Sequence, residues 1–383
     1  MNRFLLLVLL GLLAALATVV NNLFSPAMPL LADELACEPA IVQLCLTASL
    51  LGLALGHLLI GPLSDRLGRR RPLLWSMASY VAASAVLVTL PPVWLMIALR
   101  LVQGVAAGGA IVISRSIAAD MATGDRLMRM LAVINVINGL MPIVTPMLGG
   151  KLTISIGVSG SFWAMLVAGV LLADGCWHLH ETRPAIQRST AGWQHALGLF
   201  ARVLRNRECV FTLLHQAGAL VVLFANIAFT PFLLTRAGYG PGAIGVALGC
   251  NGVFTALGAG LAPAIGDARR GIWVSSVGLI VLAPVQAALL WCGAGLWPYE
   301  VLVCMMLVFV GMTLTSSSSH AMELARDVAG TASAVLGAAG FVVAAVVPPL
   351  TAAGNMLRTT ALIFLAGPAM ALLFAILHRR AAK

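Results

Sequence analysis

Long apolar segments alternate with short polar connections along all 383 residues of the chain. Within each segment the apolar residues run continuously, without the two-residue alternation of a half-buried strand, and open sheet edges are not tolerated in lipid. A helix that crosses a bilayer needs about 20 apolar residues. The pattern therefore predicts an all-α integral membrane protein whose twelve spanning helices lie near residues 4–31, 41–63, 72–91, 93–118, 128–150, 157–179, 209–235, 241–264, 272–293, 297–321, 328–350 and 358–377.

One polar stretch is longer than the others and lies between the sixth and seventh segments, from "HETRPAIQRSTAGWQ" to "RVLRNRE". It predicts a linker over residues 182–207 that joins a six-helix bundle over residues 1–181 to a second over residues 208–383. The first segment, "MNRFLLLVLLGLLAALATVV", can be read as a secretory signal peptide. Its basic region is a lone Arg3 and its apolar stretch continues past a usual signal core, so we interpret it as the first membrane helix.

The composition excludes a soluble protein, because 61% of the residues are hydrophobic and 9% are charged, whereas soluble domains are about 45–50% apolar. The net charge of +10 raises the alternative of a nucleic-acid partner. With a cytoplasmic N-terminus, eighteen basic residues fall in the even-numbered connections and at the two termini: Arg3, Arg66, Arg69, Arg70, Arg71, Arg126, Arg129, Arg183, Arg188, Arg202, Arg205, Arg207, Arg269, Arg270, Arg326, Arg379, Arg380 and Lys383.

The opposite side carries three basic residues, Lys151, Arg236 and Arg358, and an acidic turn that contains Asp33, Glu34 and Glu38. Short cytoplasmic loops of membrane proteins are enriched in Lys and Arg. We therefore predict that both termini are cytoplasmic, and that the positive charge reflects topology and not a nucleic-acid partner.

The seven cysteines are scattered, mostly inside apolar segments, and form no CxxC pair. They are expected to fill the core as small residues, without a disulfide bond or a metal. The two halves also echo each other, since "SDRLGRRR" follows the second segment and "GDARRG" follows the eighth, with Asp65 and Asp267 at matching positions. Duplicated halves are typical of alternating-access transporters.

Five motifs give the chain a specific resemblance. "GPLSDRLGRRR" (61–71) resembles the signature between the second and third helices of the major facilitator superfamily, "RLVQG" (100–104) its fourth-helix pattern, and "TPMLGG" (145–150) its fifth-helix antiporter motif. "ETRP" (181–184) and "AGTASAVLG" (329–337) resemble the twelve-helix drug/proton antiporter branch, in particular its bicyclomycin- and chloramphenicol-resistance-like members. The resemblance covers essentially the whole chain.

The first motif implies a conformational latch on the cytoplasmic face, made of Gly61, Asp65, Arg66, Gly68, Arg69 and Arg70. Glycine lets two helix ends and a tight turn approach closely, and a carboxylate such as that of Asp65 is stabilised near the N-terminus of another helix. The resemblance implies that this helix is the eleventh, near Ala329 and Gly330. The alternative is that the charges serve topology alone, with Arg70 and Arg71 simply solvated.

The antiporter motif implies a hinge or seal at the end of the fifth helix, with the residues Pro142, Thr145, Pro146, Gly149 and Gly150. Proline kinks helices and glycine allows close helix packing in lipid. The alternative is a structural kink. Thr145 departs mildly from the pattern, which usually has a small residue there.

Arg100 lies about two turns inside the outer end of its segment, with Gln103 and Gly104 close by. A charge buried in lipid is costly and marks a functional candidate. The alternative is a structural pairing of Arg100 with backbone carbonyls.

The first helix departs from the branch, where it commonly reads Asp-Met-Tyr-Leu-Pro-Ala-Met-Pro. Here "NLFSPAMP" places Asn22 at the carboxylate that is thought to carry the coupled proton, and asparagine does not titrate. His57, about 12 Å along a helix from Asp65, titrates near neutrality and is a replacement candidate; the alternative is a neutral histidine that is hydrogen-bonded between helices. Among acids, Asp174 lies more than a turn inside a segment, and Glu300 marks an outer helix end.

The resemblance implies a substrate cavity lined by the first, fourth, seventh and tenth helices. Candidate lining residues are Asn22, Phe24, Phe224, Asn226, Phe229, Phe309 and Met312. Apolar, aromatic and methionine-rich walls suit hydrophobic substrates.

The sequence thus predicts a secondary transporter of the bacterial inner membrane that exports small amphipathic drugs, in exchange for protons, by rocking of two halves. We expect that it needs no cofactor, because the proton gradient supplies the energy. Members of this fold usually act as monomers in the bilayer. An exporter or facilitator of a nucleoside, amino acid or sugar with weak or no coupling is the alternative that Asn22 favours. A membrane enzyme or receptor lacks support, because the sequence shows no metal-ligand cluster, nucleophile–base spacing or phosphate loop.

Overall fold

Every element that the computed structural model describes, over residues 3–122, 124–184, 193–293, 295–324 and 329–381, is a helix. The first group of helices consists of α1 (Arg3–Ala14), α2 (Leu16–Asn22), η1 (Ser25–Ala27), α3 (Met28–Glu34), α4 (Pro39–Leu67), α5 (Arg70–Leu87), α6 (Val93–Met121), α7 (Gly124–Ile156) and α8 (Ser159–Trp177). The second group consists of α9 (Trp193–Arg205), α10 (Arg207–Arg236), α11 (Pro241–Leu261), η3 (Ala262–Ile265), α12 (Ala268–Trp291), α13 (Leu296–Leu324), α14 (Ala329–Ala352) and α15 (Met356–Ala381).

Ten described helices are long and apolar enough to cross a membrane, and the bent first span makes up to eleven. The protein is therefore an all-helical, multi-pass membrane protein. The third predicted segment, residues 72–91, corresponds to α5, which is not among the eleven. Its 18 residues begin with Arg70 and Arg71 and include three serines, which lowers its hydropathy.

The first span is broken, whereas the sequence predicts one continuous helix over residues 4–31. Its two parts, Phe4–Ala14 and Leu16–Glu34, are bent by 48°, and the second part passes through the short η1 helix. Pro26 lies in the first turn of η1. Because proline has no N–H, the carbonyl of Asn22 loses the helical partner that residue 26 would supply. This loss fits the change from α2 to η1 and is separate from the bend at Ala15.

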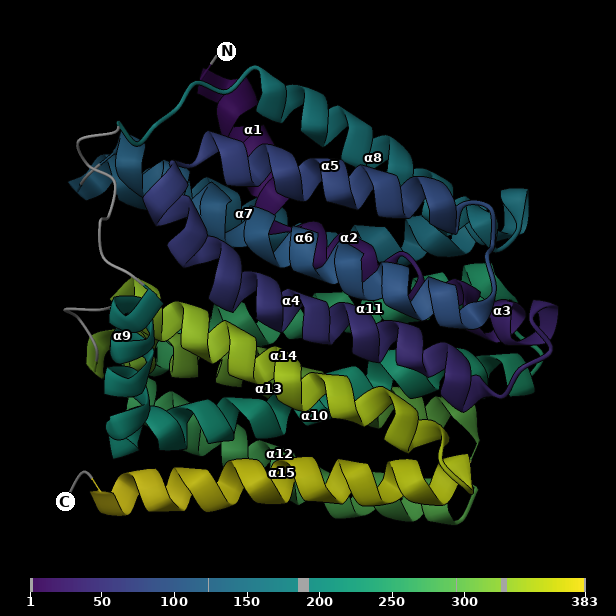
Figure 1. The fold of residues 1–383 in the computed structure, drawn as a ribbon. Coiled ribbons are helices and arrows are strands. Elements are labelled where there is room, and N and C mark those ends of the chain that lie inside the picture. Colours follow the sequence, from purple (N-terminus) through teal and green to yellow (C-terminus); the bar gives the residue numbers. More distant parts are fainter. Residues whose placement is uncertain (1–2, 123, 185–192, 294, 325–328, 382–383) are drawn as a thin grey trace.

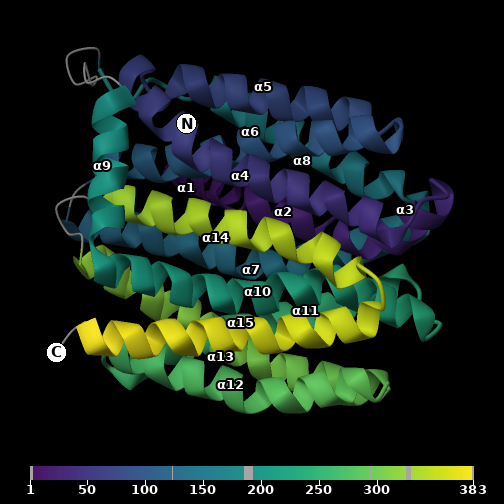
Figure 2. The same cartoon turned by 60° about the horizontal axis from the view of Figure 1, so that its bottom comes forward.

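The two groups of helices lie side by side (Figures 1 and 2). The main contacts between them are those of α4 with α14 and of α7 with α11. The start of α1, the end of α15 and the short helix α9 all lie at one end of the bundle, the α9 end, and α3 lies at the other, the α3 end. The predicted linker contains α9, which packs on α14 and α10.

Candidate functional site: a cavity between the two groups of helices

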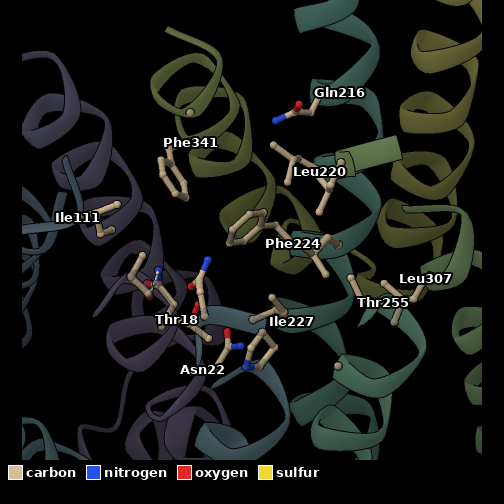
Figure 3. Close-up of a pocket in the computed structure, with 18 of the residues that line it drawn as sticks. Thr18, Asn22, Ile111, Gln216, Leu220, Phe224, Ile227, Thr255, Leu307 and Phe341 are labelled. Atoms are coloured by element: carbon tan, nitrogen blue, oxygen red, sulfur yellow. Dashed lines mark hydrogen bonds between the residues drawn. The ribbon is translucent and has the colours of Figure 1, made fainter. Parts of the chain in front are cut away.

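A cavity of about 410 Å³ lies between the two groups of helices (Figure 3). Its polar lining consists of Thr18, Asn21, Asn22, His57, Arg115, Asn138, Gln216, Asn226, Asn251, Thr255 and Ser318. Its larger apolar lining residues are Ile111, Leu220, Leu223, Phe224, Ile227, Leu248, Leu307, Leu314, Leu336 and Phe341. A mostly apolar pocket with a few polar groups is typical of small-molecule sites.

The four helices predicted to line the cavity, the first, fourth, seventh and tenth, all contribute to its wall, through α2, α6, α10 and α13. Further lining residues come from α1, α4, α7, α11 and α14. Asn22, Phe224 and Asn226 line the cavity as the sequence predicts. Phe24, Phe229, Phe309 and Met312 are not among its lining residues. Phe24 and Phe229 are buried in the core instead, because helical periodicity in a chain this apolar does not distinguish the cavity face from a packed face.

The cavity is closed at the α3 end by hydrogen bonds between the two groups. Four side chains donate them: Ser25 to the Ile227 carbonyl (2.9 Å), Gln43 to the Ala228 carbonyl (3.2 Å), Thr47 to the Ala345 carbonyl (2.6 Å) and Thr351 to Gln43 Oε1 (3.0 Å). The lining residues Arg115 and Ser318 lie toward the α9 end of α6 and α13. The cavity therefore extends toward the α9 end while the α3 end is sealed.

The tightest seal at the α3 end is the crossing of α7 and α11. A Cβ atom on Gly150 would collide with the carbonyl oxygen of Pro241, and one on Gly245 would collide with that of Pro146. These two glycines therefore let the helices meet backbone to backbone. Gly149 makes a similar contact with the Leu23 carbonyl.

The antiporter motif thus lies in the contact between the two groups. Thr145 donates to the Met141 carbonyl (2.6 Å) and Pro142 lines the cavity. The sequence places the end of this helix at residue 150, which is wrong, since α7 continues to Ile156 with Pro142 and Pro146 inside it. A proline costs a helix one hydrogen bond but does not end it when the neighbouring turns are held by packing.

A cluster of charges at the α9 end is organised around Arg69, whose side chain is 6% exposed. Its Nε donates to Asp120 (2.9 Å) and its Nη1 to both Asp65 (2.7 Å) and Ser64 (2.8 Å). Arg183 forms a second ion pair with Asp65. Two arginines therefore hold Asp65 within the first group of helices.

Glu181 completes this cluster by accepting from two backbone N–H groups at the start of α5, those of Arg69 (2.7 Å) and Arg70 (3.2 Å). A carboxylate is stabilised at a helix N-terminus, and at the start of α5 this carboxylate is that of Glu181. Thr182 also donates to Asp120 (3.3 Å). The "ETRP" motif, a family marker in the sequence, is thus a set of contacts that ties the end of the first group to the loop after α4.

The remaining predicted latch residues take different positions. Gly68 ends α4 with φ of +88°, a conformation that glycine adopts readily, and Gly61 is buried in α4. Arg70 donates to the Trp177 carbonyl (2.8 Å), whereas Arg66 is exposed. The predicted contact of Asp65 with the start of the eleventh helix lies outside the described residues, since 325–328 and the side chains of 329–333 are not described.

Arg100 lies outside the cavity lining and is fully buried in the first group. It donates to the Val20 carbonyl (2.8 Å) and to Gln103 Oε1 (3.0 Å), and its guanidinium lies 4.8 Å from the centre of the Phe24 ring. This geometry matches the alternative of a pairing with a backbone carbonyl. Gly104 lets α6 approach α4, since a Cβ there would collide with the Ser49 carbonyl.

His57 lies on the cavity wall, with its ring 5.5 Å from that of Phe341. Its Nδ1 is 2.9 Å from the carbonyl oxygen of Leu53. A carbonyl only accepts, so Nδ1 carries a proton and Nε2 of the neutral ring keeps its lone pair. The alternative interpretation expects a hydrogen bond between helices, but this bond lies within α4 and fixes the ring in a tautomer that leaves Nε2 of the neutral form as an acceptor.

Glu300 is the carboxylate that sequence reasoning places at a helix end and that the structure places beside the cavity. Its Oε2 accepts from Asn251 Nδ2 (3.3 Å), and the same Nδ2 lies 3.4 Å from Asn226 Oδ1. Its Oε1 is buried without a hydrogen-bond partner among the described residues. Both asparagines line the cavity. In the sequence Glu300 lies only one turn inside a membrane helix. An error of a few residues in the predicted start of that helix is enough to place Glu300 at its end and to hide its burial.

The chain belongs to the Major Facilitator Superfamily, whose family model matches residues 10–348. It is 30% identical to an uncharacterized MFS-type transporter, YdgK, of Bacillus subtilis, over 91% of this chain and 89% of that protein. It is 27% identical to multidrug resistance protein D of Escherichia coli (87% and 84% covered) and 24% identical to a bicyclomycin resistance protein homolog of Haemophilus influenzae (96% and 93%). These relatives confirm the predicted resemblance to the drug-resistance branch.

Among solved structures, the fold is similar to that of a D-xylose-proton symporter, with a TM-score of 0.80 and 14% sequence identity over 99% of this chain and 97% of that chain. At this identity the likeness concerns the fold alone.

Proposed function

We propose that the protein exports small amphipathic compounds, drugs among them, across the bacterial inner membrane in exchange for protons. The observation that carries this proposal is the cavity, which lies between the two groups of helices, is mostly apolar, and is closed at the α3 end by hydrogen bonds between described residues. The names of the relatives, which include multidrug and bicyclomycin resistance, support a drug as the substrate.

The proposed topology has twelve spans, with α5 as the third, and both termini in the cytoplasm. The α9 end carries Arg66, Arg69 and Arg70 and is then the cytoplasmic end, in accord with the positive-inside rule. The described conformation is accordingly inward-facing. Outward opening would separate the α3 end and close the α9 end, where Asp65 would exchange its partner Arg183 for the start of α14.

The proposed proton carrier is Glu300. Because Asn22 replaces the usual acid of the first helix and does not titrate, an exchanger needs another group that gains and loses a proton. Glu300 contacts the cavity through Asn251, and among the described residues it forms no ion pair, so an ionised form would lack compensation. His57 is the second candidate, with its free Nε2 on the cavity wall.

The experiment is transport by the purified chain in proteoliposomes that contain a pH-sensitive dye, with an imposed pH gradient and a panel of drugs and nucleosides. A substrate that releases protons and is accumulated against its gradient supports exchange. Substrate movement without proton movement would contradict the coupling and favour the uncoupled metabolite facilitator that Asn22 suggests. No vectorial movement of any compound would remove the exporter proposal.

A further inference from the structure

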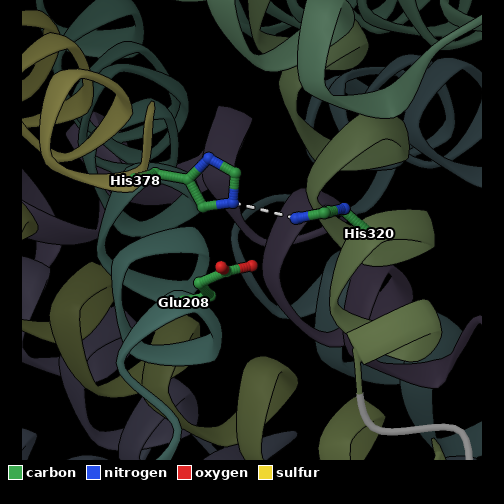
Figure 4. A group of neighbouring side chains, drawn as sticks. All are labelled: Glu208, His320 and His378. Carbon is green, nitrogen blue, oxygen red and sulfur yellow. Dashed lines mark hydrogen bonds between the residues drawn. The ribbon is translucent and has the colours of Figure 1, made fainter. Parts of the chain in front are cut away.

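Three side chains with metal-binding atoms converge at the α9 end of the second group, away from the cavity lining (Figure 4). Glu208 comes from α10, His320 from α13 and His378 from α15. The Nε2 atoms of the two histidines are 2.8 Å apart, and the potential ligand atoms of all three residues lie within 4.8 Å of one another. Both histidines are 3% exposed.

A hydrogen bond between two neutral imidazoles explains the distance between the rings, with one Nε2 donating and the other accepting. It does not explain why a carboxylate faces the same point. Two imidazole nitrogens and one carboxylate oxygen, with a water as fourth ligand, form a known three-residue set for zinc. Tetrahedral bonds of about 2.0–2.1 Å to one ion require the two nitrogens to be roughly 3.3 Å apart. The two Nε2 atoms are 2.8 Å apart, so a small outward shift of the rings would admit the ion.

The neighbouring groups leave these three atoms available. Among the described residues Glu208 forms an ion pair with Arg269, whose Nη2 is 3.6 Å from Oε2. The Arg269 side chain is 49% exposed, so this ion pair is readily exchanged. The nearby His215 lies two turns from Glu208 on α10, but its Nδ1 contacts Ser317 (2.9 Å) and its Nε2 contacts Ser276 (2.8 Å). His215 therefore has no ring nitrogen left for a metal.

We propose that Glu208, His320 and His378 bind a borderline divalent transition-metal ion, with Zn²⁺ as its representative. Imidazole nitrogen selects Zn, Ni, Co or Cu over Mg and Ca, which prefer oxygen ligands. The ion would join the α9 ends of α10, α13 and α15. Since α10 and α13 also line the cavity, it would fix two cavity helices to a third at the end that opens. The binding step does not depend on the proposed export function.

The test uses the full chain in detergent, with any affinity tag removed by proteolysis, and Co²⁺ followed by Zn²⁺ as probes. We expect one ion per chain by equilibrium dialysis, a tetrahedral Co²⁺ absorption spectrum, and displacement of Co²⁺ by Zn²⁺ but not by excess Mg²⁺. The H378Q and E208Q variants should each weaken binding at least tenfold. The matched control is H178Q, which changes an exposed histidine at the end of α8 and should leave binding unchanged.

The wild-type spectrum decides the case even where a variant fails to fold. An octahedral Co²⁺ spectrum, no saturable binding by the wild-type chain, or unchanged affinity in a folded H378Q variant would each overturn the proposal. Loss of binding in H178Q would assign the metal to the surface histidines instead.

Discussion

Asn251 donates a hydrogen bond to Glu300 over 3.3 Å and lies 3.4 Å from Asn226, so one amide links a buried carboxyl group to the cavity. This relationship predicts that E300Q abolishes proton release on substrate addition, because an amide keeps the shape and the hydrogen bond but does not titrate. Substrate binding should change less than about threefold. The measurements are dye-reported proton release in proteoliposomes and substrate binding in detergent.

The matched variant is H57Q, which removes the second proposed proton carrier, a residue of the cavity wall. Proton release should persist in it. The reverse pattern, with release retained by E300Q and lost in H57Q, would assign the proton to His57. Retention in both variants would show that neither residue carries it.

The crossing of α7 and α11 predicts a strong effect of one methyl group. G150A places a Cβ against the Pro241 carbonyl, so the helices must separate at the α3 end and transport should fall by at least about tenfold. With S25C added as a probe at this buried position of the sealed end, the G150A chain should react faster with a soluble maleimide than the chain that carries S25C alone. The control is G139A on the same helix, where a Cβ meets nothing within 4 Å. Equal transport by the two variants would contradict the seal.

The contacts of Arg69 predict that R69Q lowers the stability of the protein much more than R66Q does. R69Q leaves Asp120 without its ion-pair partner and leaves Asp65 with Arg183 alone. Breaking a fully buried pair costs about 3–5 kcal/mol, and because Asp65 is 42% exposed the cost here should be smaller, about 1–3 kcal/mol. R66Q changes an exposed side chain and should cost less than about 0.5 kcal/mol. Thermal unfolding of the two variants in one detergent compares them, and similar midpoints would show that the cluster contributes little to stability.

Two native cysteines test the proposed topology. Cys292, exposed after α12, and Cys37, half-buried before α4, lie at the α3 end, so a membrane-impermeant maleimide should label them from outside the cell membrane. Partial burial raises the pKa of the Cys37 thiol. Less thiolate is then present at neutral pH, and Cys37 should react more slowly than Cys292.

The labelling is measured by mass spectrometry on right-side-out and inside-out vesicles, with C292S as the control. Faster labelling of Cys292 in inside-out vesicles would reverse the orientation. That result would contradict the positive-inside assignment and leave the fold unchanged.

The sequence by itself determined the class of protein and the location of its main motifs. Continuous apolar segments separated by basic connections require a helical membrane protein, because lipid leaves no other way to satisfy the backbone. The motifs around Asp65 and Gly150 identified the superfamily that the family comparison confirms. These features are local in the chain, so no knowledge of its three-dimensional contacts was needed.

Which polar groups face the cavity and which are structural follows from the three-dimensional contacts, not from the sequence. Arg100 and Glu300 both lie in apolar segments. Arg100 donates a hydrogen bond to the Val20 carbonyl of the broken first span, whereas Glu300 accepts one from the cavity residue Asn251. Glu208, His320 and His378 come from three helices that are distant in the chain. Their roles depend on helix rotation and on the register between helices. Helix rotation and register cannot be read from a uniformly apolar sequence, because in lipid both the packed and the exposed faces of a helix are apolar.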